Sequence, residues 1–536
     1  MATPDWVTNG FPTGAIEVVN TPGHPSRHAT IAHPYNFAPR LGFAYQVDPK
    51  TVVRGSLAVL YLPTSGNLST YGDTPGIYYT TAADNQSTQG PPGPNTGYVD
   101  AGGVYHTPRT VENPWDSSQI TGFSRNNTQV VNAQAAASGQ GVGGMSIYAH
   151  MPHEFDWSLG VQRQLPNQWL LELTYAGNSS NDLLTIGNPS HFPKGLYNGG
   201  PQGVNKNLYE NFSAPSPTAG QITDNNYTGL VQPLGILEYA YPYYGPVIEE
   251  GVNIGTNNFE SAQARLQRRF ANGFQMLFNY TYSKSLDDTG GSDVSLGNPG
   301  QGSGSGGKSF QQVDASIHSV YGLSSLDETH RISTFYDYQL PFGRGRKWMR
   351  NPAGIGGELV ELAAGGWEVS GTTGFRSGRP VVLSVQGSTT DQAIYIRNTF
   401  GSLASGATLS QIYNPHAQNP IDPSGTSPWA NATPAFNVNA IANGGSVASF
   451  TYGNIPATIG AFRNPGNWTS DLSTMKNFTF SKDGSRYLQL RLEGLNIFNH
   501  PGRGAYDPNT GDSTFGFIQG PGNGERHLQL GGRLVF

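Results

Sequence analysis

The segment Gly273-Phe-Gln-Met-Leu-Phe-Asn-Tyr-Thr-Tyr-Ser-Lys284 indicates the fold of the whole chain. Its apolar side chains Met276, Phe278, Tyr280 and Tyr282 alternate with Gln275, Leu277, Asn279 and Thr281. Successive side chains of a strand point to opposite sides, so period two predicts a β-strand with one apolar face. The preceding Ala271-Asn-Gly predicts a tight turn, because Asn and Gly accept positive φ. The segment is therefore predicted to be the second strand of a hairpin.

Similar alternation recurs along the sequence, and helical periodicity is almost absent. The predicted strands are eleven segments: 41–47, 51–61, 154–164, 168–177, 259–270, 273–284, 329–340, 366–377, 469–480, 485–498 and 526–536. Most of them have about the ten residues that a tilted strand needs to cross a bilayer.

The connections between these strands alternate between short and long. Four long connections separate the strand pairs: residues 62–153, 178–258, 285–328 and 378–468. In an antiparallel sheet every second connection lies at the same end, so all four fall on one side. Outer-membrane barrels have short periplasmic turns and long extracellular loops, whereas a soluble β-sandwich has turns every 8–12 residues. We therefore predict an all-β, antiparallel up-and-down outer-membrane β-barrel, with 11–12 strands in residues 41–536. Residues 1–40 form an N-terminal loop or a weak extra strand.

One connection on the side of the short turns, residues 341–365, is much longer than a tight turn. It contains four basic residues: Arg344, Arg346, Lys347 and Arg350. A solvated basic turn is the simpler interpretation. Contact with lipid or with a partner is the alternative.

Composition excludes several classes of protein. Charged residues make up 12% of the 536 residues, against roughly 25% in soluble globular domains. The longest apolar run, Leu57–Leu62, is far shorter than the about 20 residues of a membrane-spanning helix. The chain has no Cys, which rules out disulfides, thiolate metal sites and Cys nucleophiles. The net charge of -6 gives no indication of a nucleic-acid partner.

The C-terminal strand is the most specific single feature. Leu528, Leu530, Leu534 and Phe536 share one face of it, and the chain ends on the aromatic residue. This pattern resembles the C-terminal strand by which outer-membrane proteins are recognised for barrel assembly. We therefore expect these four residues to engage the barrel-assembly machinery and outer-membrane lipid.

A series of motifs, in this order, resembles TonB-dependent transporters of the Oar-like class. They are Asn36-Phe-Ala-Pro-Arg-Leu-Gly-Phe-Ala-Tyr45, Lys50-Thr-Val-Val-Arg-Gly55, Trp157-Ser-Leu-Gly-Val-Gln-Arg-Gln-Leu-Pro166, Gln267-Arg-Arg-Phe-Ala-Asn-Gly273, Asn279-Tyr-Thr-Tyr-Ser-Lys-Ser-Leu-Asp-Asp288, His330-Arg331, Leu340-Pro-Phe-Gly-Arg-Gly-Arg346, Gly365-Gly-Trp367, Ser377-Gly-Arg-Pro380 and Leu495-Asn-Ile-Phe-Asn-His-Pro501. The resemblance runs from about residue 36 to the end and is strongest in the strands.

The resemblance implies a bacterial outer-membrane barrel of about 22 or more strands, plugged by an N-terminal domain and driven by the TonB complex. The sequence shows no signal peptide, plug or TonB box. Complete single-chain barrels usually have an even strand number, and eleven strands are predicted here. We therefore expect the C-terminal part of a larger barrel, with the signal, the plug and the remaining strands encoded upstream. TonB would act only through that plug, which is absent from this chain.

Motifs typical of catalysis lack the surroundings they need. Gly302-Ser-Gly-Ser-Gly-Gly-Lys-Ser309 fits a phosphate-binding loop, but no strand precedes it and no clear amphipathic helix follows it. Asp287, Asp288 and Asp293 form no EF-hand pattern, and the histidines form no H-E-x-x-H frame: His24, His28 and His33. We assign no catalytic, cofactor-binding or metal-binding residue, and we do not expect an enzyme.

The sequence is compatible with three functions. The first is uptake of a bulky ligand, with specificity in the long loops and candidate lumen residues Gln162, Glu172, Gln275, Asn279, Arg491 and Glu493. The second is a secreted or surface β-rich binding or adhesion protein, which detergent dependence would distinguish. The third, a nucleotide-dependent enzyme, depends only on the Gly/Ser tract around Lys308.

Overall fold

The computed structural model describes residues 35–62, 98–99, 105–106, 142–145, 150–186, 211–213, 231–233, 247–288, 321–351, 353–383, 401–414, 417, 433–445, 454–456, 458–481, 485–500, 502–518 and 524–536. Within these ranges, no helix is long and apolar enough to cross a membrane.

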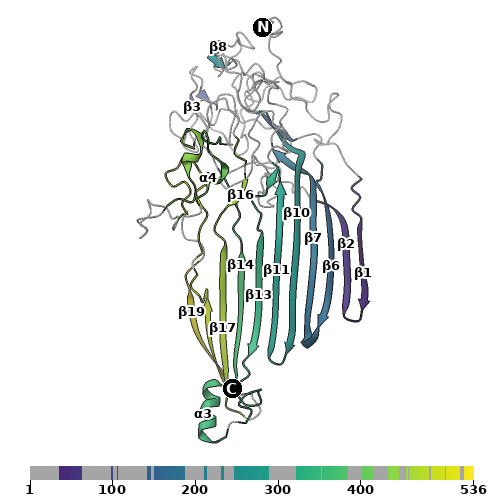
Figure 1. The fold of residues 1–536 in the computed structure, drawn as a ribbon, viewed down its shortest axis with the longest axis vertical. Coiled ribbons are helices and arrows are strands. Elements are labelled where there is room, and N and C mark those ends of the chain that lie inside the picture. Colours follow the sequence, from purple (N-terminus) through teal and green to yellow (C-terminus); the bar gives the residue numbers. More distant parts are fainter. Residues whose placement is uncertain are drawn as a thin grey trace.

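One large antiparallel sheet dominates the fold, and its strands follow one another in chain order (Figure 1). They are β1 (Arg40–Asp48), β2 (Thr51–Tyr61), β6 (His153–Leu165), β7 (Trp169–Ile186), β10 (Val247–Ala271), β11 (Phe274–Asp287), β13 (His330–Gln339), β14 (Trp367–Arg376), β17 (Asn467–Thr479), β18 (Tyr487–Leu495) and β19 (His527–Val535). This order is the up-and-down topology that the sequence predicts. All eleven predicted strands are present.

The hairpin quoted at the outset forms as expected. Asn272 and Gly273 adopt φ of 53° and 76°, and Ala271 pairs with Phe274 to close the turn between β10 and β11. Asn and Gly tolerate this left-handed conformation, which explains why the chain reverses at these two residues.

The register joins the apolar faces of the separate strands into one continuous surface. Met276 of β11 pairs with Tyr336 of β13, and Leu492 of β18 pairs with Leu530 of β19. Because paired residues point to the same side of a sheet, these side chains share a surface, here called the apolar face. The opposite, largely polar side is called the polar face. Leu530 is 77% exposed on the apolar face, as a lipid-facing surface requires.

Two strands run further than the sequence predicts. β7 continues to Ile186 and β10 begins at Val247, so the connection predicted as residues 178–258 is shorter. Register shifts interrupt their pairing, for example between Asn253 and Gly255. Each shift breaks the period-two pattern of side chains. Backbone pairing continues where side-chain alternation is lost. The alternation therefore predicts shorter strands than the structure contains.

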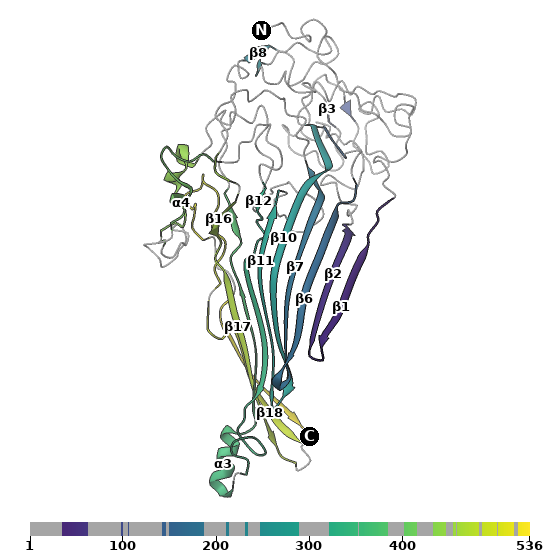
Figure 2. The same ribbon diagram turned by 45° about the vertical axis from the view of Figure 1, so that its right-hand side comes forward.

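The two ends of the sheet differ, as Figures 1 and 2 show. Tight turns lie at one end, here called the turn end, and the long connections leave the other, here called the loop end. Helix α3 (Gly354–Ala364) hangs from the turn end. It lies within residues 341–365, for which the sequence favoured a solvated basic turn. The helix was not predicted. Both views show the sheet curved along its width.

Small elements occupy the loop end. They are β12 (Gly322–Leu323), β15 (Pro380–Val382), β16 (Thr458–Arg463), α4 (Leu409–Ile412) and the 3-10 turns η10 (Val438–Ala440) and η11 (Ala442–Gly445). Short strands are also present: β3 (Tyr98–Val99), β4 (Tyr105–His106), β5 (Val142–Met145), β8 (Asn211–Ser213) and β9 (Val231–Pro233). Among described strands, β1 pairs only with β2 and β19 pairs only with β18.

Candidate functional site

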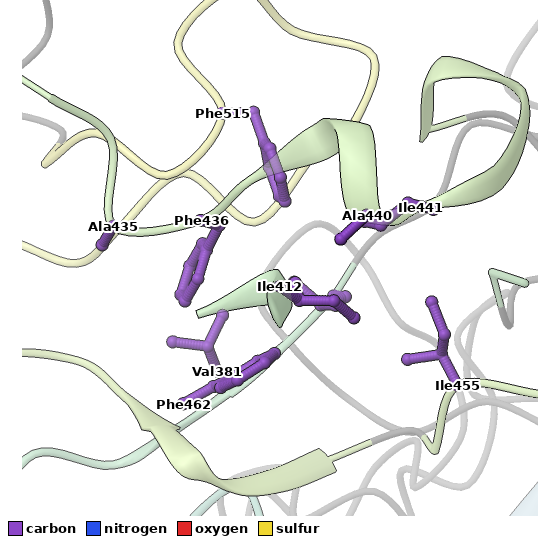
Figure 3. Packing of buried hydrophobic residues seen from close by; sticks show 10 residues of the cluster. Val381, Ile412, Ala435, Phe436, Ala440, Ile441, Ile455, Phe462 and Phe515 are labelled. Atoms are coloured by element: carbon purple, nitrogen blue, oxygen red, sulfur yellow. The ribbon is translucent and has the colours of Figure 1, made fainter. Parts of the chain in front are cut away.

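A compact hydrophobic core lies at the loop end of the sheet, near α4 and β16 (Figure 1), and Figure 3 shows its packed side chains. Ile412, Phe436 and Phe462 are almost completely buried, at 0%, 1% and 1% exposure. The other buried members of the cluster are Val381, Leu383, Ala435, Ala440, Ile441, Ile455 and Phe515. Loops with a core of their own hold a defined shape, and loops carry most binding functions.

Two connections that are distant in sequence build this core together. The ring of Phe436 lies 5.4 Å from that of Tyr506 and 5.6 Å from that of Phe515. The backbone N–H of Ala435 donates to the carbonyl of Gly516 at 2.9 Å. The segment between β14 and β17 is thus packed on the segment between β18 and β19. We call the described parts of both, residues 380–383, 401–414, 417, 433–445, 454–456, 458–463 and 502–518, the loop unit.

Tyr506 brings a titratable group into the edge of this core. Burial raises the pKa of the Tyr506 phenol, the proximity of Tyr413 raises it further, and the Arg503 guanidinium opposes both effects. The ring is therefore held in its neutral form over the ordinary pH range.

A buried ion pair fastens the loop unit to the sheet. Arg463 Nη2 lies 2.7 Å from Oδ2 of Asp327, whose side chain is 1% exposed. Arg463 Nη1 also donates to the carbonyl of Gly378 at 3.1 Å. Asp327 in turn accepts the backbone N–H of Ser285 at 2.8 Å. This network joins the loop-end termini of β11, β14 and β16, and it places the loop unit above one part of the sheet.

A pocket of about 290 Å³ opens beside this network. Its walls include three arginines, Arg376, Arg379 and Arg503, and one carboxylate, Glu328. Arg379 Nε lies 3.1 Å from Oε1 of Glu328, and Arg376 Nη1 lies 3.9 Å from the same atom. Three arginines and one carboxylate line the pocket, so it carries excess positive charge. Arginine forks bind carboxylate and phosphate oxygens, so the pocket is suited to an anionic group.

A second hollow, of about 320 Å³, lies lower on the polar face. Polar side chains of β14, β17, β18 and β19 line it, among them Asp471, Glu493, His527 and Gln529. Asp471 accepts the backbone N–H of Asn496 at 2.8 Å, and Glu493 pairs with Arg491 at 3.3 Å. These contacts are internal to the sheet. Phe335, Leu472 and Leu495 also line the hollow, and most of its exposed surface is apolar.

The six candidate lumen residues all lie on the polar face, as the pairing registers show. They are spread along the sheet: Gln162 pairs with Glu172, whereas Arg491 and Glu493 belong to β18. Gln275 and Asn279 donate hydrogen bonds to their neighbours in β13, at 3.0 Å to Asp337 Oδ2 and 3.3 Å to Ser333 Oγ. The structure therefore does not gather these six residues into one site.

The motifs considered for catalysis fall partly outside the described residues: Gly302–Ser309, Asp293, His24, His28 and His33. Asp287 and Asp288 are described and buried. Asp288 accepts two hydrogen bonds from Thr256, at 2.6 Å from its N–H and 2.9 Å from its hydroxyl. In the part of the chain that the structure describes, no group of His, Asp or Glu residues is arranged to hold a metal ion.

The arginine pocket was missed from sequence. Arg376 and Arg379 lie where β14 ends, Arg503 lies between β18 and β19, and Glu328 lies just before β13. Spacing along the chain does not show that these three segments meet. Arg379 stands in the motif Ser377-Gly-Arg-Pro, which the sequence shows only as part of a family resemblance.

Several solved structures are similar to this chain at low sequence identity. One of them is the outer membrane transporter YddB from Escherichia coli, at 10% identity and TM-score 0.37, over 94% of this chain and 41% of that one. The siderophore receptor PirA from Acinetobacter baumannii is similar at 12% identity and TM-score 0.37, over 93% of this chain and 41% of that one. The pyoverdine outer membrane receptor FpvA from Pseudomonas aeruginosa is similar at 11% identity and TM-score 0.34, over 93% and 36%. The chain thus spans well under half the length of these structures.

No curated protein matches the chain in sequence. One family, described as "Outer membrane beta barrel domain", matches residues 2–529, which is nearly the whole chain. The alternating strands, the up-and-down order and the contrast between the two ends of the sheet agree with this match. The chain belongs to the outer membrane beta barrel domain family, whose members are β-barrel proteins of the bacterial outer membrane.

Proposed function

We propose that this chain is the C-terminal barrel part of a TonB-dependent outer-membrane receptor, of the Oar-like class, that takes up a bulky anionic ligand. It acts by binding and passage rather than by catalysis. Residues 41–536 supply the barrel portion with its long loops, residues 1–40 lead into it, and TonB supplies the energy through a plug domain. The C-terminal residues Leu528, Leu530, Leu534 and Phe536 serve recognition by the barrel-assembly machinery.

The observation that carries the proposal is the arginine pocket at the base of the loop unit. Arg376, Arg379 and Arg503 line this pocket with one carboxylate, Glu328, at the point where the loops meet the polar face. An anionic group bound in this pocket would lie at the loop end of the polar face. A ligand larger than the pocket would extend from it under the loop unit, which is why a bulky ligand with an acidic group fits best.

Nutrient depletion by intact cells tests the proposal. The native host, its gene deletion and complemented strains would be grown in one medium, and the acidic compounds remaining would be compared. The expected result is a compound that only the complemented strain removes, with removal abolished by a protonophore. The double variant Arg379→Glu/Arg503→Glu should lose this uptake.

A charge-matched control is Arg486→Glu, which reverses an exposed charge at the turn end between β17 and β18, far from the pocket. It should keep uptake. The alternative function, a secreted or surface binding or adhesion protein, predicts a different outcome: no compound depends on the gene, but attachment of cells to surfaces does. Extraction without detergent would also favour that alternative.

A further inference from the structure

Helix α3 carries an apolar surface that no other described part of the chain covers. Ile355 is 83% exposed, Leu359 60% and Leu362 57%. At 100° per residue these three side chains fall on one side of the helix. A soluble protein would bury such a stripe against its core, so this helix needs another apolar neighbour.

Next to this stripe, Glu358 and Glu361 form an acidic flank of α3 that faces the helix's own connection. Glu358 pairs with Arg344 at 2.5 Å, and Glu361 accepts the backbone N–H of Arg344 at 2.9 Å. These two contacts fix the rotation of the helix about its axis. They hold the carboxylates toward the turn and leave the apolar stripe pointing away from it.

The C-terminal end of α3 is attached to the apolar face of the sheet. Lys476 Nζ donates to the carbonyls of Glu361 and Leu362, at 2.9 and 2.6 Å. The indole N–H of Trp367 donates to the carbonyl of Ala363 at 2.8 Å. Lys476 pairs with Trp367 on one side and with Leu490 on the other, so it belongs to the apolar face. A cation at a helix C-terminus is favourable, because the last carbonyls carry partial negative charge.

The surrounding side chains suit a phospholipid surface. Trp348 is 49% exposed, and Lys347 Nζ lies 5.3 Å from the centre of its ring. Arg350 is exposed in the same connection. Trp with Lys and Arg is the usual composition where a protein meets lipid headgroups, and the basic side chains complement their phosphates.

We propose that α3 and Trp348 lie in the interface of the inner, periplasmic leaflet of the outer membrane, with Ile355, Leu359 and Leu362 immersed among phospholipid chains. The turn end of an outer-membrane barrel is periplasmic. Attachment to the lipid-facing side of β14 and β17 puts the helix at the membrane rim rather than below the lumen. The apolar stripe then continues the apolar face of the sheet, as in interfacial amphipathic helices.

Single-cysteine labelling tests this inference, because these 536 residues contain no Cys and any Cys in the rest of the receptor can be replaced by Ser. The full-length receptor carrying Leu359→Cys would be labelled with an environment-sensitive fluorophore and reconstituted in phosphatidylethanolamine/phosphatidylglycerol vesicles. The matched control is Glu358→Cys, one residue away on the acidic flank. Its pair with Arg344 is 61% exposed and contributes little to stability, and the contact of Glu361 with the Arg344 N–H remains to orient the helix.

The expected result at position 359 is a blue-shifted emission, quenching by nitroxide-labelled phospholipid, and loss of most quenching by iodide. The label at position 358 should show the reverse. Ile355→Cys provides a second site should the Leu359 variant fold poorly. Equal iodide quenching at positions 358 and 359 would overturn the inference. Protection from iodide without quenching by lipid nitroxide would also overturn it, since a protein would then cover the stripe.

Discussion

Arg463 and Asp327 form a nearly buried ion pair, 2.7 Å between Nη2 and Oδ2, across two connections more than a hundred residues apart in sequence. Asp327 is 1% exposed and Arg463 24%. The pair therefore links the position of the loop unit to the end of the sheet.

Replacing Arg463 with Ala leaves the carboxylate of Asp327 buried with only its neutral donors. We expect the free energy of opening of the loop unit to fall by about 2–4 kcal/mol. Hydrogen exchange of amides in residues 433–445 measures this. Arg491→Ala breaks the exposed pair with Glu493 and should cost at most about 1 kcal/mol. Similar effects of the two variants would contradict the role given to Arg463.

The core of the loop unit should be sensitive to cavities. Phe436→Ala removes a ring that packs on Phe462, Tyr506 and Phe515, and should destabilise the unit by about 3–5 kcal/mol. Protease cleavage within the unit should increase while the β-sheet signal in circular dichroism is kept. Phe498→Ala, at a site 66% exposed, is the control and should change neither. An unchanged cleavage pattern for Phe436→Ala would show that the unit does not depend on this core.

The loop unit should weaken at alkaline pH. Because burial raises the pKa of Tyr506, the folded state holds the phenolic proton more tightly than the unfolded state. The resulting stability is fully present below the unfolded pKa of about 10 and is lost as pH rises through the higher folded pKa. Thermal unfolding of the unit followed across this range should show the loss. Tyr506→Phe should flatten the profile, and a profile unchanged by this substitution would rule out Tyr506 as its source.

Barrel assembly should depend on the apolar side of the last strand. Removing Phe536 from the full-length receptor should lower its level in outer-membrane fractions, and Leu534→Ser should act in the same direction. Val535→Ser changes the neighbouring residue on the opposite side of β19 and serves as the control. Immunoblots of isolated outer membranes measure the level. Equal amounts of all these variants would refute a role for this side of the strand.

Period two predicts structure where the sheet is regular. Met276, Phe278, Tyr280 and Tyr282 share a face because their hairpin is uninterrupted from Asn257 to Arg268 on the partner strand. The same pattern fails near Asn253, where register shifts break it. Local rules also missed α3, since Gly354, Gly356 and Gly357 disfavour a helix and tertiary contacts from Lys476 and Trp367 hold its end.

The loop unit and its arginine pocket were beyond prediction from sequence for a different reason. Phe436 meets Phe515, and Arg379 meets Glu328, only after the sheet has brought their connections together. Periodicity describes neighbours along a strand and carries no information about which loops meet. The fold class therefore followed from local pattern, whereas the site depends on long-range packing.

The shared core of the loop unit has a consequence for receptor engineering and for evolution. Phe436 lies between β14 and β17, whereas its partners Tyr506 and Phe515 lie between β18 and β19. If only one of the two connections were transferred from a relative, the shared hydrophobic core would combine side chains from two proteins. These side chains would not pack together. Recombination that retains a working receptor must transfer both connections as a single cassette, so residues 378–518 are the natural unit of exchange between relatives.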